Sequence, residues 1–265
     1  MRTLSNLRLH ALTASVLAAF FASLSLNVSA GEPVRATGTI EPEEVVSVGP
    51  QVSGIITSFG ADPNSPGTTI DWGSRVEAGT VLARLDDALY RAQVEIAQAA
   101  VARAEAEFKD AKAKASSGLP GTPLVPAVAA TLVQCRAELK IAEINLGHTL
   151  IKSPIKGVII DRRVNVGQNV TPSLSAASLF LVASDLRKLQ VWVSVNEKDV
   201  SQMKVGTPAT FTVDAYPKLV FQGKVKQIRL NAQMTQNIVT YTVVVTTDNP
   251  DGKLMPYLTA HVEFH

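Results

Sequence analysis

Residues that could carry catalysis or ligate a metal ion are few and scattered in this chain. Past residue 30 the histidines are His148, His261 and His265, two of them at the extreme end, and the sole cysteine is Cys135. Their surroundings contain no nucleophile elbow, phosphate-binding loop or metal-ligand spacing. The sequence therefore predicts a protein that is not an enzyme, holds no cofactor or metal, and leaves any ATP consumption to a partner.

One short motif occurs twice, at 51–79 and at 154–167. Each copy reads as an apolar residue, any residue, Gly, a β-branched pair, and later Val-x-x-Gly at a turn. The glycines of the repeat are Gly54, Gly79, Gly157 and Gly167. The first glycine of each copy is expected where a strand bends or approaches another closely, and the second where a turn requires positive φ. We expect the two halves to pair face to face in one small β-sandwich, with 61–72 as a surface insertion or, alternatively, a contact with a neighbouring subunit.

The adjacent acids Asp86 and Asp87 could serve acid–base chemistry, but they also precede a helical pattern. A carboxylate there accepts the free backbone N–H groups of a first helical turn, so capping explains the pair without catalysis. A lipoyl or biotin carrier would use the same β half-motifs and needs a Lys at the exposed turn between them. Because Asp86-Asp87-Ala88 leads into the helix instead, the sequence argues against a carrier.

Between the two copies, apolar or small residues alternate in steps of four and three, which is the coiled-coil period. The first series is Tyr90, Val94, Ala97, Val101, Ala104, Phe108, Ala111 and Ala115, and the second is Val128, Leu132, Cys135, Leu139, Ala142 and Leu146. We predict helices over 87–115 and 127–146, about 40 and 30 Å long. The Gly- and Pro-containing stretch 116–123 makes them an antiparallel hairpin. Its Ala-rich seams favour packing against neighbouring hairpins, with an inert spacer as the alternative.

A second β module follows residue 186. Alternating apolar residues predict a strand over 189–195, a helical turn over 197–203, and further strands over 209–213, 221–230, 241–247 and 260–264. Together with an early strand over 35–40, these suggest a small antiparallel barrel. The fold class is thus mixed β with an inserted α-helical coiled-coil hairpin.

Residues 1–30 are typical of an export signal. Arg2 and Arg8 give a basic start, 11–26 is apolar, and Val28-Ser29-Ala30 is a small-residue cleavage site. The apolar stretch is shorter than the roughly 20 residues of a spanning helix, which favours a cleaved peptide, with an uncleaved anchor as the alternative. The prediction is a mature protein in the periplasm, associated with the inner membrane through its partners.

The mature chain has no charge bias. Arg2 and Arg8 are the charged residues of 1–30, so their removal changes 25 basic against 23 acidic residues to 23 against 23. This balance argues against a nucleic-acid binder. A lone Cys135 cannot form an intrachain disulfide, so the fold depends on packing.

Several of these stretches together resemble the periplasmic adaptors, also called membrane fusion proteins of the HlyD type. The resemblance covers nearly all of 34–264. It is carried by 38–42 (Gly-Thr-Ile-Glu-Pro), 48–54, 84–86 and 151–158, while 181–186, 240–245 and 249–252 are most similar to the macrolide-export adaptors that serve ABC transporters.

The resemblance implies a lipoyl-like domain split by the hairpin, followed by a β-barrel, with assembly into a six-membered ring. Such rings join an inner-membrane transporter to an outer-membrane channel, and similarity to the macrolide-export adaptors implies a transporter of ABC type. Many channel-docking members carry an Arg, a Leu and a Ser at the hairpin tip; the aligned residues are Ala115, Leu119 and Pro126, so Leu119 is the candidate contact. Macrolide-type members continue into a membrane-proximal domain, whereas the printed sequence stops at His265.

The predicted organisation combines these elements. It consists of a signal peptide (1–30), an N-terminal strand joining the barrel (31–43), the first lipoyl-like half (44–86), the hairpin (87–147), the second lipoyl-like half (148–184) and the β-barrel (185–265). The predicted function is a periplasmic adaptor of an envelope-spanning export complex. The alternative is a non-transport envelope scaffold that uses the hairpin to bind partners.

Overall fold

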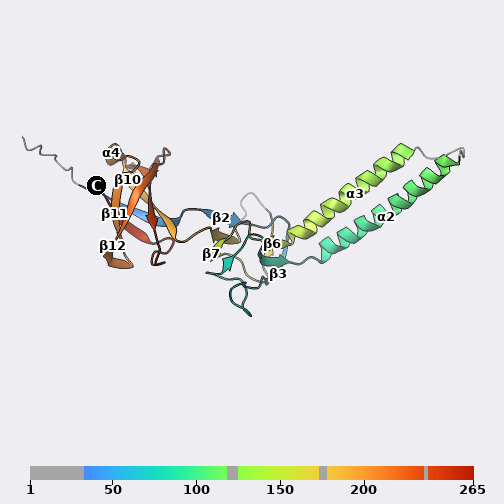
Figure 1. The fold of residues 1–265 in the computed structure, drawn as a ribbon, viewed down its shortest axis with the longest axis horizontal. Helices are drawn as coiled ribbons and strands as arrows, with labels where there is room; N and C mark the ends of the chain where they lie inside the picture. Colours follow the sequence, from blue (N-terminus) through green and yellow to red (C-terminus); the bar gives the residue numbers. More distant parts are fainter. Residues whose placement is uncertain (1–32, 118–124, 173–177, 236–237) are drawn as a thin grey trace, which may run out of the picture.

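Three modules follow one another along the long axis of the molecule (Figure 1). The computed structural model describes residues 33–117, 125–172, 178–235 and 238–265. A β-barrel lies at one end, a two-sheet module in the middle, and a pair of long helices at the other end. The predicted signal peptide 1–30 and the tip residue Leu119 lie outside the described residues. Within the described part, no helix has the length and apolar character to cross a membrane.

The middle module is a sandwich whose two sheets share both halves of the chain. Its strands are β2 (Val45–Val48), β3 (Gly54–Phe59), β4 (Arg75–Val76), β5 (Val81–Leu85), β6 (Leu150–Lys152), β7 (Gly157–Arg162), β8 (Asn169–Val170) and β9 (Phe180–Ala183). One sheet has the order β2-β9-β7-β4 and the other β6-β5-β3-β8. Each sheet therefore takes two strands from before the hairpin and two from after it.

The sequence predicts that each half forms one sheet and that the two sheets pack face to face. In the structure each sheet instead contains strands from both halves. β4 pairs with β7 and β8 pairs with β3, so the short strands of each half complete a sheet begun by the other. Two-stranded ribbons are at best marginally stable alone, and three or more strands with a buried face are needed. Exchanging strands gives both sheets that number around one core, which includes Ile56, Leu82, Ile159 and Phe180.

The hairpin consists of α2 (Ala88–Ser116) and α3 (Val125–His148), within two residues of the predicted bounds. Among the seam positions, Val94, Ala104, Ala111, Leu132 and Cys135 are buried, while Ala115 is exposed. Asp86 Oδ1 accepts a hydrogen bond from the Ala88 backbone N–H at 3.1 Å, as expected for one of the two acids. Asp87 instead binds Arg91 one turn further on, at 2.8 Å. The predicted coiled-coil hairpin is confirmed.

The terminal module is a closed antiparallel barrel. Its six strands are β1 (Val34–Pro42), β10 (Lys188–Asn196), β11 (Pro208–Val213), β12 (Tyr216–Ile228), β14 (Ile238–Asp248) and β15 (Thr259–Phe264). β10 pairs with both β1 and β14, so the strand order returns on itself. α4 (Glu197–Val200) follows β10, and β13 (Gln233–Thr235) extends the sheet beside β14. The predicted fold class of split sandwich, hairpin and barrel is confirmed.

Candidate functional site

The first glycine of the second half-motif lies where two strands approach too closely for any side chain. A Cβ on Gly157 would stand 2.2 Å from the Ala183 carbonyl oxygen and 2.9 Å from Val182 Cγ1. Ordinary contacts are about 3.5 Å or longer, and the obstacle is backbone on the paired strand β9. Its counterpart Gly54 is less confined, because the nearest atom to a Cβ there would be Leu85 Cβ at 3.2 Å. The two equivalent glycines are thus under unequal steric constraint.

The second glycine of each half-motif has positive φ, 87° at Gly79 and 85° at Gly167, a region that side-chain-bearing residues rarely adopt. Each also donates its backbone N–H to the opposite half. Gly79 donates to Ser153 O and Gly167 to Ile56 O, both at 2.8 Å. Sequence reasoning missed this exchange, although the repeat itself was the signal that could have suggested it.

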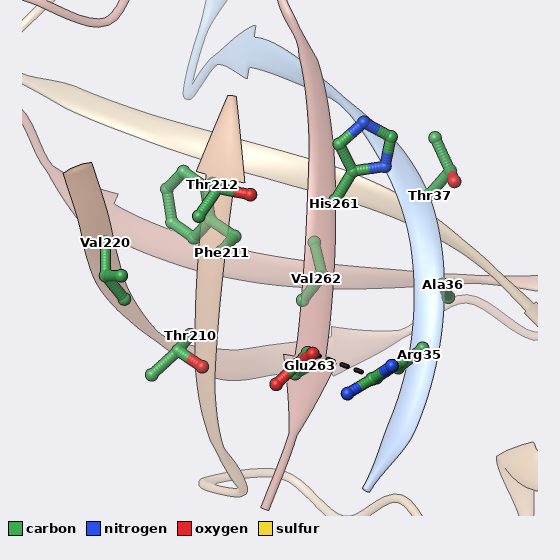
Figure 2. A pocket seen from close by; sticks show the side chains of 10 residues that line it. All are labelled: Arg35, Ala36, Thr37, Thr210, Phe211, Thr212, Val220, His261, Val262 and Glu263. Carbon is green, nitrogen blue, oxygen red and sulfur yellow. Dashed lines mark ion pairs between the residues drawn. The ribbon is translucent and has the colours of Figure 1, made fainter. Parts of the chain in front are cut away.

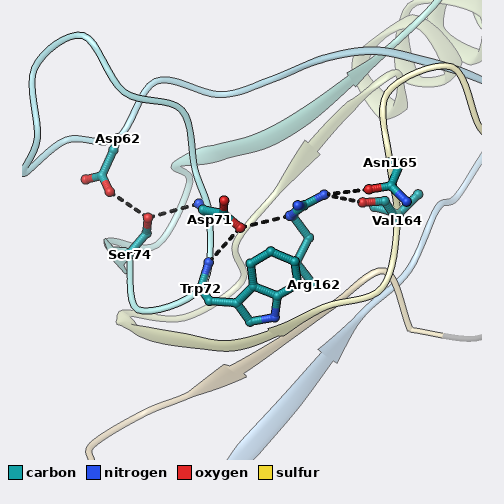
Figure 3. A network of polar contacts seen from close by, with 7 residues as sticks. All are labelled: Asp62, Asp71, Trp72, Ser74, Arg162, Val164 and Asn165. Atoms are coloured by element: carbon teal, nitrogen blue, oxygen red, sulfur yellow. Dashed lines mark hydrogen bonds and ion pairs between the residues drawn. The ribbon is translucent and has the colours of Figure 1, made fainter.

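The insertion 61–72 is fastened to the sandwich through Arg162 (Figure 3). Only 12% of the Arg162 side chain is exposed, and its Nε donates to Asp71 Oδ1 at 3.0 Å. The guanidinium lies over the ring of Trp72 at 4.3 Å and that of Phe59 at 4.7 Å. Its Nη1 donates to the Val164 carbonyl at 2.6 Å. The shielded cation of Arg162 thus has π and carboxylate partners, and Trp72 packs against it although 55% of that residue is exposed.

A second anchor holds the base of the same insertion. The buried Ser74 hydroxyl donates to Asp62 Oδ2 and accepts from the Asp71 backbone N–H at 3.0 Å (Figure 3). Hydrogen bonding from Ser74, then from the Asn64 backbone, lowers the pKa of Asp62 below its ordinary value. The insertion therefore has a defined shape, which is what a contact surface for another protein requires.

The hairpin carries an apolar groove along one flank of its seam. Ile96 on α2 and Ile141 on α3 are 71% and 59% exposed. The groove is lined by Gln93, Ile96, Ala97, Ala100, Glu138, Ile141, Ala142 and Asn145. The other flank is charged, with Arg136 bound to Glu105 at 2.8 Å. One flank therefore exposes apolar side chains that no other part of the described chain covers. On the other flank, charged side chains form an ion pair between the two helices.

The barrel has a shallow depression on its outer face over β1, β11 and β15 (Figure 2). Arg35 and Glu263 form an ion pair at 2.9 Å within it, and His261 Nε2 lies 2.9 Å from Asp214 Oδ1. The charged groups of this depression are thus paired with each other at the surface, and the depression presents no unpaired side chain positioned as a general base. Within the described ranges no set of three or more His, Cys, Asp or Glu side chains is arranged to hold a metal ion.

Taken together, these modules define a β-sandwich split by a projecting helical hairpin and joined to a closed barrel, the architecture of an adaptor subunit. Two family models match the chain: the RND MFP barrel-sandwich hybrid domain over residues 44–182, and the CusB-like β-barrel domain over residues 190–265. The chain belongs to the membrane fusion proteins, which are non-enzymatic adaptors.

Individual relatives agree with this assignment. The pyoverdine export membrane fusion protein PvdR of Pseudomonas aeruginosa is 27% identical over 271 residues, covering 87% of this chain and 69% of PvdR. The macrolide export protein MacA of Escherichia coli O157:H7 is 24% identical over 253 residues, covering 87% and 67%. The crystal structure of MacA from Actinobacillus actinomycetemcomitans matches with a TM-score of 0.73 at 25% identity, covering 88% of this chain and 78% of that one.

Proposed function

We propose that this chain is the periplasmic adaptor subunit of an export complex, joining an inner-membrane transporter of ABC type to an outer-membrane channel. The observation that carries the proposal is the sandwich split by a long hairpin, since this layout separates two contact surfaces by the length of the molecule. Similarity to PvdR and MacA, both named for export, supports a transport role. The ABC type is proposed from the resemblance of 181–186 and 240–245 to macrolide-export adaptors.

The hairpin groove supports assembly of several copies into a ring, which we propose to be hexameric by resemblance. Ile96 and Ile141 expose large apolar side chains on one flank of the hairpin, outside the seam between the helices. Single exposed apolar residues are common on monomers, but two isoleucines flanking one groove of alanines form a surface that a neighbouring hairpin could cover. The proposed occupant is the hairpin of a second copy.

The repeat glycines are proposed to act structurally, and the tip is proposed to be the channel contact. Gly54, Gly79, Gly157 and Gly167 keep the two halves of the sandwich joined at the base of the hairpin. Leu119 is the proposed tip residue, on the strength of its match to channel-docking adaptors. The protein is proposed to reach the periplasm through the export signal in residues 1–30, with cleavage after Ala30.

The test is photo-crosslinking in cells from single positions on the full chain. We expect probes at Ile96 and Ile141 to capture further copies of the chain, and a probe at Leu119 to capture an outer-membrane channel. A probe at Ala106, on the outward face of α2, is the matched control. The proposal fails if the purified protein remains monomeric at high concentration and no transporter or channel is captured from any position. Capture of other envelope proteins alone would favour the scaffold alternative.

A further inference from the structure

A β-ribbon projects from the barrel and exposes apolar side chains that the barrel does not use. The ribbon consists of β13 and the beginning of β14. Met234 on β13, Ile238 at the start of β14, and Leu230 three residues before β13 are 72%, 52% and 91% exposed. We name these three residues the ribbon tip. β10 pairs with β14 only from Thr240 onward, so the start of β14 has β13 as its described partner. The ribbon tip therefore extends beyond the closed wall of the barrel.

Apolar side chains occur on both faces of this ribbon. Met234 pairs with Val239, and Thr235 pairs with Ile238. Because paired residues share a face and successive residues alternate, Met234 and Ile238 lie on opposite faces. A protein partner that covers one face of a ribbon leaves the other in water. An apolar medium that surrounds the ribbon buries both, so the pattern favours lipid over a second copy or a flat protein surface.

The charge pattern around the ribbon points the same way. No Asp, Glu, Lys or Arg occurs from Leu230 through Thr247. At the base of the ribbon, the Arg229 guanidinium lies 3.8 Å over the ring of Trp192, which is 36% exposed. Trp and Arg side chains, each with an apolar body and a polar end, are typical of the boundary between lipid tails and water. The ribbon thus has uncharged apolar residues at its tip and a Trp and an Arg at its base. Proteins that enter the lipid surface place these residue types in the same order, with apolar residues among the lipid tails and Trp and Arg at the boundary with water.

The ribbon also lies at the end of the barrel from which the chain leads toward residues 1–30. Asn196 pairs with Thr240 at the ribbon base, and on the same strand β10 Ser194 pairs with Thr37 near the start of β1. The apolar stretch 11–26 precedes β1 by the seven residues 27–33, which span at most about 25 Å when extended. In the alternative of an uncleaved anchor, this end of the barrel is held beside the lipid surface; after cleavage at Ala30, attachment depends on the ribbon alone.

We propose that the ribbon tip inserts into the lipid surface of the inner membrane and forms an attachment separate from the N-terminal segment. Insertion is shallow, about 5–10 Å, because the free edge of β13 carries backbone polar groups that the hydrocarbon interior cannot satisfy. The adjacent α4 carries Glu197, Lys198 and Asp199, which together with Arg229 at the ribbon base give no excess of positive charge. Binding is therefore independent of anionic lipid. This proposal goes beyond the transport role and requires no particular transporter.

The test measures the environment of the ribbon tip in the full chain reconstituted in phosphatidylcholine vesicles. Cys135→Ala removes the native thiol, and Met234→Cys allows attachment of an NBD fluorophore at position 234. Ala106→Cys provides a matched label on the outward face of α2, away from the hairpin groove. We expect a blue-shifted emission at position 234 and at least twofold quenching by brominated phosphatidylcholine. Position 106 should show neither effect. Replacing a third of the lipid by phosphatidylglycerol should change the result little.

Two outcomes would overturn the proposal. One is equal quenching, or none, at positions 234 and 106. The other is a blue shift at position 234 that occurs without vesicles and increases with protein concentration, which would identify a second copy as the occupant. Adding Leu230→Ser and Ile238→Ser should reduce quenching at position 234, with far-UV circular dichroism confirming that the barrel is retained. Crosslinking to a transporter is read out separately, so failure of lipid insertion leaves the adaptor function standing.

Discussion

The barrel and the hairpin are stabilised in opposite ways. The barrel core contains sixteen buried residues, contributed by all six strands of the wall and by the connecting segments, and its wall closes on itself. The hairpin core cluster contains three buried residues, Ala104, Leu132 and Cys135. Burial of apolar surface is the main stabilising term in folding, and its size follows the area removed from water. The barrel is therefore expected to be stable by itself, whereas the hairpin has little core of its own.

This difference indicates what each region does. A closed barrel has paired strands all round and few places for another chain to add a strand. The hairpin leaves Ile96, Ile141, Val133 and Leu89 exposed, each by more than half. A region with a thin core and exposed apolar side chains has more to gain from a neighbouring copy. The part of the molecule that sequence patterns describe most clearly is thus the part whose stability depends most on partners.

The largest expected effect compares one phenylalanine in each region. Phe211 is 1% exposed and stacks on Phe221 with ring centroids 5.4 Å apart, so Phe211→Ala should lower the free energy of unfolding by about 3–5 kcal/mol. Phe108 is only partly buried on the hairpin seam, and Phe108→Ala should cost about 1 kcal/mol. Urea denaturation of both variants measures the contrast. Equal losses would show that the hairpin core is as important to the monomer as the barrel core.

The next largest effect tests the sandwich that joins the two regions. Gly157→Ala places a methyl group against the Ala183 carbonyl and should destabilise the chain by about 2–3 kcal/mol, because β7 and β9 must separate. Gly147→Ala is the matched control in α3. A Cβ there meets nothing within 4 Å, and the exchange should stabilise the helix by up to about 1 kcal/mol. Thermal unfolding distinguishes the two; similar melting temperatures would contradict the close approach.

A smaller, pH-dependent effect concerns the anchored insertion. The hydrogen bond from Ser74 lowers the pKa of Asp62 in the folded protein. The stability that this hydrogen bond contributes is therefore fully present above the ordinary carboxyl pKa of about 4, and it is lost as the pH falls through the lower pKa of the folded state. Ser74→Ala should therefore reduce stability at pH 7 more than at pH 3. Because Asp62 is partly exposed to solvent, the pH-dependent part should stay below about 1 kcal/mol. Denaturation curves of both proteins at the two pH values measure the difference in the free energy of unfolding. A larger loss of stability at pH 3 than at pH 7 would contradict the role assigned to the Ser74–Asp62 hydrogen bond.

The smallest effect on the monomer should accompany a large effect on assembly. Ile96→Ser combined with Ile141→Ser removes exposed apolar side chains, so the free energy of unfolding should change by about 0.5 kcal/mol or less. Self-association, measured by sedimentation velocity, should weaken at least tenfold. Lys109→Ser with Lys140→Ser, at exposed helix positions, controls for loss of surface side chains. Unchanged association of the isoleucine variant would remove the groove from the proposed interface.

Much of the fold could be predicted from local patterns. Steps of four and three residues identify both helices, since a coiled-coil seam requires that period, and the Gly- and Pro-containing stretch ends the first of them. Alternation at Leu189, Val191, Val193 and Val195 identifies a barrel strand, and all four residues are buried. The capping role of Asp86 follows from the need of a first helical turn for acceptors.

The candidate surfaces were less accessible to sequence reasoning. Arg162 and Trp72 are 90 residues apart in the chain, and nothing local to either indicates that a guanidinium and an indole will stack. Of the ribbon tip, Leu230 ended a predicted strand, whereas Met234 and Ile238 lay between two predicted strands, because the alternation of apolar residues does not reveal a ribbon that the barrel leaves outside. Long-range pairing determines both features.

The sequence by itself determined the order and kind of the modules: a repeated glycine motif, a heptad hairpin between its copies, and a barrel after them. Only the tertiary structure decided that the two copies exchange strands, that Gly157 is far more confined than Gly54, and that the barrel closes through β10 and β14. The physical reason is that periodicity and turn preference are local properties of the chain, whereas strand partners are chosen by which distant segments complete a sheet and bury a shared core.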